Sequence, residues 1–240
     1  KNPLICSEGK DANFRELLHE HATGYLAPLI KELKVKWNVE MMKGGLTLVD
    51  LPGVGVAGDI KAEVTERWIR EHAKAIVLVV DTRGVRETEA ELLRNSGFLN
   101  RLLHAAHDPS SDPVILMVAV THIDKIAEQE YLDGKANAPG KKRTDYLADV
   151  CEKVRARIAN QVEEQLTKVW KATTGLSETK AEVIKEIIAK LQVHPVSAPQ
   201  YRQLLMEDED VVPFIKTREQ SNIPQMLKAL CEVVQNRASD

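Results

Sequence analysis

The strongest pattern in the chain is a set of apolar, β-branched runs of strand length. They occupy Leu29–Val39, Gly45–Leu51, Ala75–Asp81, Val114–Val120 and Gln192–Val196. The first run alternates apolar and polar residues, which indicates a half-exposed or edge strand, whereas the continuous runs indicate buried central strands. A short, Gly-containing segment separates the first two runs, which predicts that those two form an antiparallel hairpin.

Helical periodicity fills the intervals between the later runs. Ile60–His72 and Thr88–His107 have the spacing of amphipathic helices, with Thr88 and Glu91 at capping-box spacing, and a third such segment is Ile223–Arg237. Alternating strands and helices are typical of βαβ units. We therefore expect a three-layer α/β fold in which a mixed, mostly parallel sheet has helices on both faces.

The segment Lys142–Leu191 departs from this alternation. Apolar residues recur there every three or four positions, at Leu147, Val150, Val154, Ile158, Val162, Leu166 and Val169. Thr173–Ser177 interrupts the pattern, which resumes over Val183–Leu191. We expect a helical hairpin inserted into a single domain that spans residues 1–240. The hairpin either packs on the sheet as a long crossover pair or forms an arm for a partner or for self-assembly.

Composition and charge narrow the function classes. Hydrophobic residues make up 43% and charged residues 29%, as in ordinary folded proteins, and the formal net charge is −3. This balance gives no general attraction to nucleic acid, so we expect no specific nucleic-acid partner. The three cysteines are far apart, and no apolar run reaches the length of a membrane span. We expect a cytoplasmic protein, with the nucleus as the alternative.

Polar residues follow three of the strand runs. They are Asp50 and Gly53 after the second run, Thr121, His122 and Asp124 after the fourth, and Ser197 and Ala198 after the fifth. In open α/β sheets, ligands bind beyond the carboxyl ends of the strands. A carboxylate there can hold a magnesium ion through water, and a glycine amide can approach a phosphate closely. Taken alone, Asp-x-x-Gly also arises from an ordinary Pro-Gly turn.

The order of these endings carries more information than any one of them. Asp-x-x-Gly, then Thr-x-x-Asp, then Ser-Ala resembles the nucleotide-contacting motifs of GTPases. The segments LVDLPGVG, VSAPQY and SNIPQMLKAL resemble the dynamin superfamily of large GTPases, in particular its bacterial dynamin-like and nuclear branches. The resemblance covers about Leu29 to Arg237. It implies a P-loop-GTPase-like domain that binds GTP with Mg²⁺, hydrolyses GTP to GDP and phosphate, and self-associates; membrane contact would lie outside this chain.

The resemblance also implies roles on the base side of the site. Asp124 would accept the N1 and N2 protons of guanine with its two carboxylate oxygens, an arrangement that adenine does not satisfy. Backbone N–H groups of Ser197 and Ala198 would reach guanine O6, and Thr121 would hold the loop by hydrogen bonding. His122 stands where the family has a lysine whose stem covers the base, which puts guanine specificity in question.

On the phosphate side, the resemblance implies that Asp50 contacts Mg²⁺ through water and that Gly53 contacts the γ-phosphate. No Gly-x-x-x-x-Gly-Lys-[Ser/Thr] loop occurs in the sequence, and Gly9–Lys10 lacks its other residues. Because the chain opens on Lys1, we expect N-terminal truncation of the domain, with natural loss in a non-catalytic interaction module as the alternative. A truncated domain would be weak or inactive as a GTPase.

Other candidates are weaker. Thr23 could be the switch threonine, although a residue that ends a helix is the simpler interpretation. The adjacent residues His19–His21 point to different helix faces, and His104 with His107 fits a helix end better than a metal site. The basic loop Lys135–Arg143 is a solvated connection by default, with an anionic lipid or nucleic acid as the other possibility.

Overall fold

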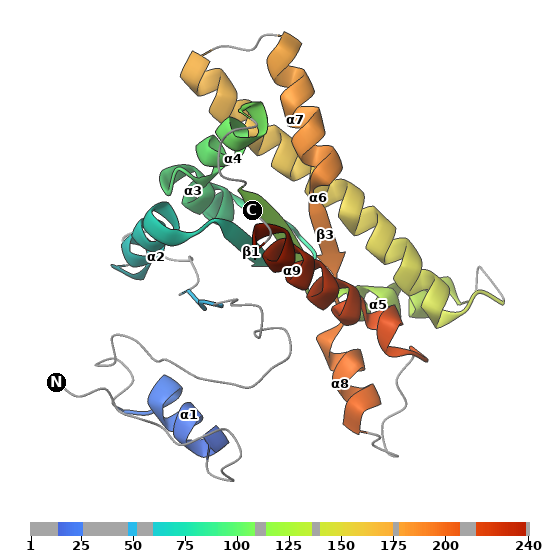
Figure 1. Ribbon diagram of the computed structural model, residues 1–240. Coiled ribbons are helices and arrows are strands. Elements are labelled where there is room, and N and C mark those ends of the chain that lie inside the picture. Colours follow the sequence, from blue (N-terminus) through green and yellow to red (C-terminus); the bar gives the residue numbers. More distant parts are fainter. Residues whose placement is uncertain are drawn as a thin grey trace. The chain divides into compact units, whose positions relative to one another are not determined.

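The computed structural model describes residues 14–25, 48–51, 60–108, 114–135, 140–174, 178–206 and 215–238 (Figure 1). The chain divides into two compact units: Lys1–Val49 with Leu230–Asp240, and Asp50–Ala229. The described residues of the candidate site lie in the second unit. The prediction of a single domain over residues 1–240 stays a prediction.

The first unit contains helix α1 (Phe14–Thr23). Thr23 is its last residue, and its hydroxyl donates a hydrogen bond to the carbonyl oxygen of His19 at 2.8 Å. Thr23 therefore closes a helix, as the simpler interpretation of the sequence held.

The predicted antiparallel hairpin is only partly open to comparison, because Leu29–Val39 and residues 45–47 lie outside the described residues. Residues 48–51 are described and are not in a strand, so the prediction is wrong for them. Leu48 and Val49 are exposed, so this apolar run lacks the burial that stabilises a central strand.

The second unit is built on a parallel sheet in the order β1-β2-β3. The strands are β1 (Ala75–Val80), β2 (Ile115–Val120) and β3 (Gln192–Pro195), within one residue of the predicted runs. The described sheet has no antiparallel pair, so within these ranges it is parallel and not mixed. Val80, Val120 and Pro195 lie in register, which aligns the carboxyl ends of all three strands at one edge.

The core explains why these runs form the sheet. β2 is buried along nearly its whole length, as expected of a parallel strand covered on both faces. Leu116, Val118 and Val120 belong to the main hydrophobic cluster, and Met117 and Ala119, which point to the opposite face, are buried as well. The α/β layering that the sequence predicts is therefore present around the central strand.

Helices α2 (Ile60–His72), α3 (Glu87–Asn95) and α4 (Phe98–His107) correspond to the first predicted helical segments. The single helix expected over Thr88–His107 is wrong, because Gly97 adopts a left-handed φ of 72° that ends α3 before α4 begins. The expected capping pair is also displaced. Glu89, not Glu91, accepts the N–H of Arg86 at the start of α3.

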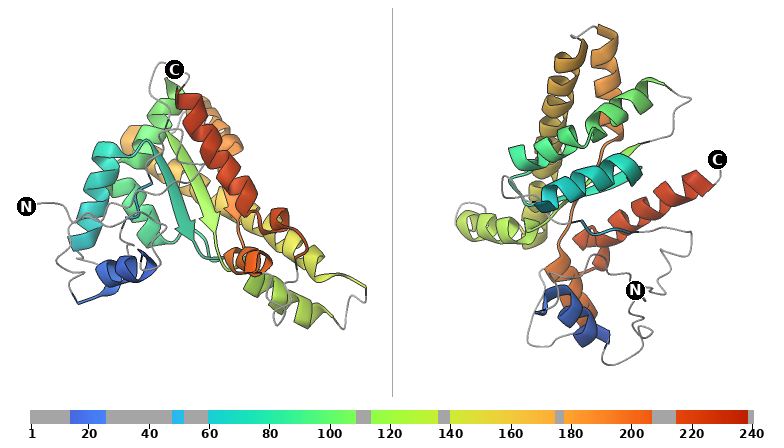
Figure 2. Two further views of the ribbon diagram at one scale, coloured as in Figure 1. Left: turned by 60° about the horizontal axis from the view of Figure 1, so that its bottom comes forward. Right: turned by 90° about the vertical axis from the view of Figure 1, so that its left-hand side faces the viewer.

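The predicted helical hairpin is α6 (Arg143–Thr174) followed by α7 (Glu178–Lys190), which lie side by side in Figures 1 and 2. The whole apolar stripe of α6 is buried in the main cluster, including Ile158 and Leu166 at zero exposure. α6 also packs against β3 and α4. Of the two interpretations of the sequence, the structure supports the hairpin that packs on the sheet, since its apolar face is already covered.

The remaining elements are α5 (Ile123–Gly134), α8 (Ala198–Met206), a short 3-10 helix η3 (Arg218–Ser221) and α9 (Ile223–Ala238). α9 matches the predicted terminal helix. Within the part of the chain that the structure describes, no helix combines the length and the apolar character needed to cross a membrane.

Candidate functional site

The carboxyl edge of the sheet gathers most of the residues that the sequence singled out. Thr121, His122 and Asp124 follow β2, and Ser197 and Ala198 follow β3, the strand beside it. Val196 continues this pairing, because its N–H donates to the carbonyl oxygen of Val120 at 2.8 Å. The two loops therefore leave neighbouring strands at the same edge, where α/β proteins bind ligands.

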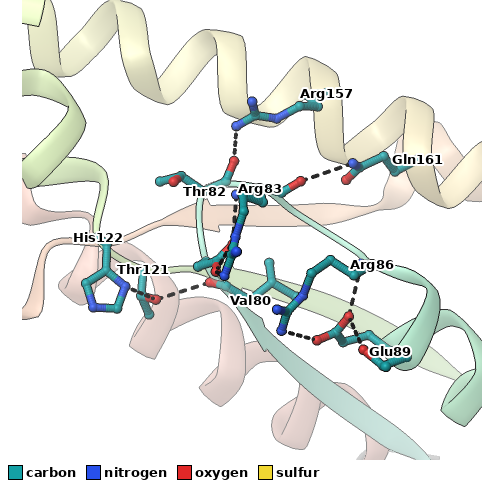
Figure 3. A network of polar contacts seen from close by, with 11 residues as sticks. Val80, Thr82, Arg83, Arg86, Glu89, Thr121, His122, Arg157 and Gln161 are labelled. Atoms are coloured by element: carbon teal, nitrogen blue, oxygen red, sulfur yellow. Dashed lines mark hydrogen bonds and ion pairs between the residues drawn. The ribbon is translucent and has the colours of Figure 1, made fainter. Parts of the chain in front are cut away.

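Thr121 ties the loop after β2 to the end of β1. Its N–H and its hydroxyl both donate to the carbonyl oxygen of Val80, at 2.9 and 3.2 Å (Figure 3). A single backbone acceptor thus fixes both the main chain and the side chain of Thr121. Residues 122–124 start from a firmly held point.

His122 has an unusual backbone conformation for its position. It precedes α5 with φ 62° and ψ 21°, a left-handed region that costs a non-glycine residue about 1 kcal/mol. Its Nδ1 lies 3.1 Å from the Thr121 hydroxyl oxygen. The ring of His122 is exposed, so it is free to meet another partner.

Asp124, in the first turn of α5, is the least satisfied acidic side chain of the site. It is only 8% exposed, and its Oδ1 is buried with no hydrogen-bond partner. A buried polar atom without a partner destabilises a protein by about 1–3 kcal/mol, so most such atoms in native structures are paired. Oδ1 of Asp124 therefore lacks a donor among the described residues.

Ser197 repeats this situation on the neighbouring strand. It is fully buried, its N–H donates to the carbonyl oxygen of Ser221 at 3.0 Å, and its Oγ has no partner. The N–H that the resemblance assigns to guanine O6 is therefore already used within the chain. Ala198 begins α8 and is exposed. The sheet edge thus holds two buried, unpartnered oxygen atoms, from Asp124 and Ser197, on adjacent strand ends.

The loop after β1 contains a group that the sequence reasoning did not use. Asp81 accepts the N–H of Arg83 at 2.8 Å and its Nε and Nη2 at 2.9 and 2.5 Å. These side-chain and backbone hydrogen bonds lower the pKa of Asp81 from 3.8 to about 2. Asp81 directly follows a strand, which is the position expected for Asp50. This shared position is the feature of the sequence that could have identified Asp81.

The described residues include one of the two residues predicted for the phosphate side of the site. Asp50 is exposed and outside any strand, and Gly53 lies outside the described ranges. Over the described ranges, no group of three or more His, Cys, Asp or Glu is arranged to hold a metal ion. Asp50 is the single acidic ligand expected for Mg²⁺ here, so the described residues do not form a magnesium site by themselves.

Comparisons with protein-family models, curated proteins and solved structures found no match to this chain.

The weaker sequence candidates lie within helices. His19 and His21 bond to Thr23 and Leu17 within α1, and His104 with His107 ends α4.

In the basic loop, Lys141 and Arg143 are each paired with an acid. Lys141 bonds Asp149 and Arg143 bonds Glu128, each at 2.5 Å. Lys135 lies over the ring of Tyr131 and Lys142 is exposed, so the described part of the loop keeps positive charge beside these two pairs.

Proposed function

We propose that this chain is a guanine-nucleotide-binding domain whose base site is the edge formed by the ends of β2 and β3. The observation that carries the proposal is the buried, unpartnered Oδ1 of Asp124. Guanine offers two adjacent donors, N1–H and N2–H, which a carboxylate can accept together. Adenine offers no such pair, so the same carboxylate discriminates between the two bases.

The neighbouring residues fit this role. Thr121 fixes the start of the loop that presents Asp124, and Ser197 lies on the adjacent strand end with an unused hydroxyl oxygen. The exposed His122 ring is available to stack on a base. By the resemblance of motif order to dynamin-like GTPases, we extend the proposal to GTP hydrolysis to GDP and phosphate, dependent on Mg²⁺ and coupled to self-association.

A direct test is the binding of fluorescent GDP, GTP and ATP analogues to the full chain, with and without Mg²⁺. We expect guanine nucleotides to bind at least about tenfold more tightly than adenine nucleotides, because one or two charge-assisted hydrogen bonds separate them. Equal binding of guanine and adenine nucleotides would contradict the guanine assignment. Binding of neither nucleotide would contradict the whole proposal.

Asp124→Ala should abolish the preference for guanine. Asp133→Ala is the matched control, since Asp133 is an exposed carboxylate on the same helix α5. Release of phosphate from GTP, measured on the same samples, tests hydrolysis separately from binding.

A further inference from the structure

The turn that follows β1 is held by the long helix α6. The side chain of Arg157 donates to the carbonyl oxygen of Thr82, and Gln161 bonds the next part of the turn (Figure 3). Both residues lie on α6, one helical turn apart, although they are far from the turn in sequence. Helix α6 thus makes hydrogen bonds to backbone atoms of residues 82–85.

Gln161 makes the more specific of these contacts. Its Nε2 donates to the carbonyl oxygen of Arg83 at 3.2 Å, and its Oε1 accepts the N–H of Val85 at 3.0 Å. The orientation of the amide follows from its partners, because a carbonyl can only accept and an N–H can only donate. Both ends of one side chain are therefore used on two backbone groups of the same turn.

The packing of Gly84 shows how closely this turn meets α6. Gly84 is buried with φ 90°, and an added Cβ would lie 2.1 Å from Oε1 of Gln161 and 2.8 Å from Cδ1 of Ile158. Ile158 is itself fully buried in the main cluster. The turn is therefore packed closely against α6 beside a residue of the main cluster.

The same turn is connected to the base site through one peptide group. The carbonyl of Val80, which accepts both hydrogen bonds from Thr121, shares a planar peptide unit with the N–H of Asp81. Asp81 is in turn fixed by its bonds to Arg83. A rotation of the turn would therefore rotate the acceptor on which Thr121 rests.

We propose that Gln161 and Arg157 are positioning residues for the nucleotide site. They hold the turn after β1, the turn orients the Val80 carbonyl, and this carbonyl fixes Thr121 and the loop that carries Asp124. The inference rests on the proposed nucleotide function, and it adds that α6 and the base site are coupled. Because coupling between sites is reciprocal, nucleotide binding should also steady the contact between α6 and the turn.

The test compares Gln161→Leu with Gln165→Leu in the full chain. Gln165 lies one turn further along α6, is more buried than Gln161, and accepts a hydrogen bond from Arg94 at 2.5 Å instead of bonding the turn. Both variants lose a hydrogen-bonded amide from the same helix, and since Gln165 is the more buried of the two, a larger effect of Gln161→Leu at the site is due to the turn. Gln161→Glu keeps an acceptor for Val85 and loses the donor to Arg83, so it should be intermediate, and it replaces Gln161→Leu if that variant does not fold.

The first readout is hydrogen exchange of the Thr121 amide, followed by NMR without nucleotide. We expect exchange about tenfold faster in Gln161→Leu than in Gln165→Leu, since the loss of a buried hydrogen-bonded contact shifts a local opening equilibrium by about that factor. Equal exchange at Thr121 in the two variants would overturn the inference, whether or not the protein binds nucleotide.

The second readout is the affinity for a fluorescent GDP analogue. Gln161→Leu should bind at least about fivefold more weakly than Gln165→Leu at matched folded fraction. If the unmodified chain binds no nucleotide, the proposed function fails and the exchange result alone decides the mechanical coupling. If the unmodified chain binds and both variants bind equally, the positioning role is overturned while the proposed function stands.

Discussion

Thr121 gives both of its hydrogen-bond donors to one acceptor, the carbonyl oxygen of Val80. This double contact joins the ends of β1 and β2 at the edge where Asp124 is presented. It therefore holds the start of the loop that carries Asp124 in a fixed position. The consequences for the base site can be tested one residue at a time.

Asp124→Asn should change which base the protein prefers. An amide in place of the carboxylate offers one acceptor and one donor, which complements xanthine, with its N1–H and O2, and not guanine. We expect guanine nucleotides to lose affinity and xanthosine nucleotides to gain it by comparable factors, measured by competition against a fluorescent analogue. A variant that still preferred guanine would show that Asp124 does not contact the base.

The same variant also separates a binding role from a structural one. Asp124 lies in the first turn of α5, where its charge stabilises the helix by about 0.5 kcal/mol, and asparagine loses this charge but keeps a polar atom at the buried, unpartnered position. We therefore expect the free energy of unfolding to change by less than about 0.5 kcal/mol. A loss of several kcal/mol in urea unfolding would mark Asp124 as a structural residue.

Gly84→Ala should destabilise the protein by about 3 kcal/mol or more. Gly84 has φ 90°, and its new methyl group would collide with Gln161 and Ile158 on a buried helix. Gly97→Ala is the control: Gly97 has φ 72°, nothing lies within 4 Å of an added Cβ, and only the left-handed backbone opposes it, at about 1 kcal/mol. Equal costs in thermal or urea unfolding would mean that the turn is not pressed against α6.

Some parts of the fold could be predicted from the sequence and others could not. The strands β1, β2 and β3 were predicted within one residue because continuous β-branched runs leave few alternatives for a buried segment. The break at Gly97 was missed because an apolar helical pattern continues across it, and a glycine inside such a pattern does not by itself mark a helix end.

The candidate site divides in a similar way. The order of polar strand endings predicted that Thr121, Asp124 and Ser197 would lie at one edge, because parallel strands end together. The contacts of Gln161 and Arg157 were not predictable, since their partners are backbone carbonyl and N–H groups, which every residue carries. Such contacts leave no sequence motif.

Asp81 should contribute to stability in a way that depends on pH. Its pKa falls from 3.8 to about 2 on folding, so the folded state binds a proton less readily than the unfolded state. The contribution is therefore fully present above pH 3.8 and is lost as the pH falls through 2. Because Arg83 is largely exposed and solvent screens the pair, the effect should be below about 1 kcal/mol.

Asp81→Asn tests this sign. The variant should be less stable than the unmodified chain at pH 6, and the difference should shrink toward zero in urea unfolding as the pH is lowered below 3. An NMR titration of the Asp81 carboxyl group gives the folded pKa directly. A midpoint near the ordinary value would contradict the pairing with Arg83.

His122→Gly should separate stability from binding. Glycine removes the left-handed strain at φ 62°, but it raises the entropy of the unfolded chain and removes the contact to Thr121. These effects nearly cancel, so we expect the free energy of unfolding to change by less than about 0.5 kcal/mol. If the exposed ring stacks on the base, nucleotide affinity should fall about fivefold or more.

Asn222→Gly is the matched control, because Asn222 shares the left-handed conformation at φ 58° and lies near the same sheet edge. Its side chain, however, donates to the carbonyl oxygen of Pro195 at 2.7 Å, so its loss should cost about 1 kcal/mol. If His122→Gly leaves the free energy of unfolding unchanged, the fold does not require the His122 side chain. If His122→Gly destabilises the protein as much as Asn222→Gly and leaves affinity unchanged, His122 belongs to the scaffold and not to the base site.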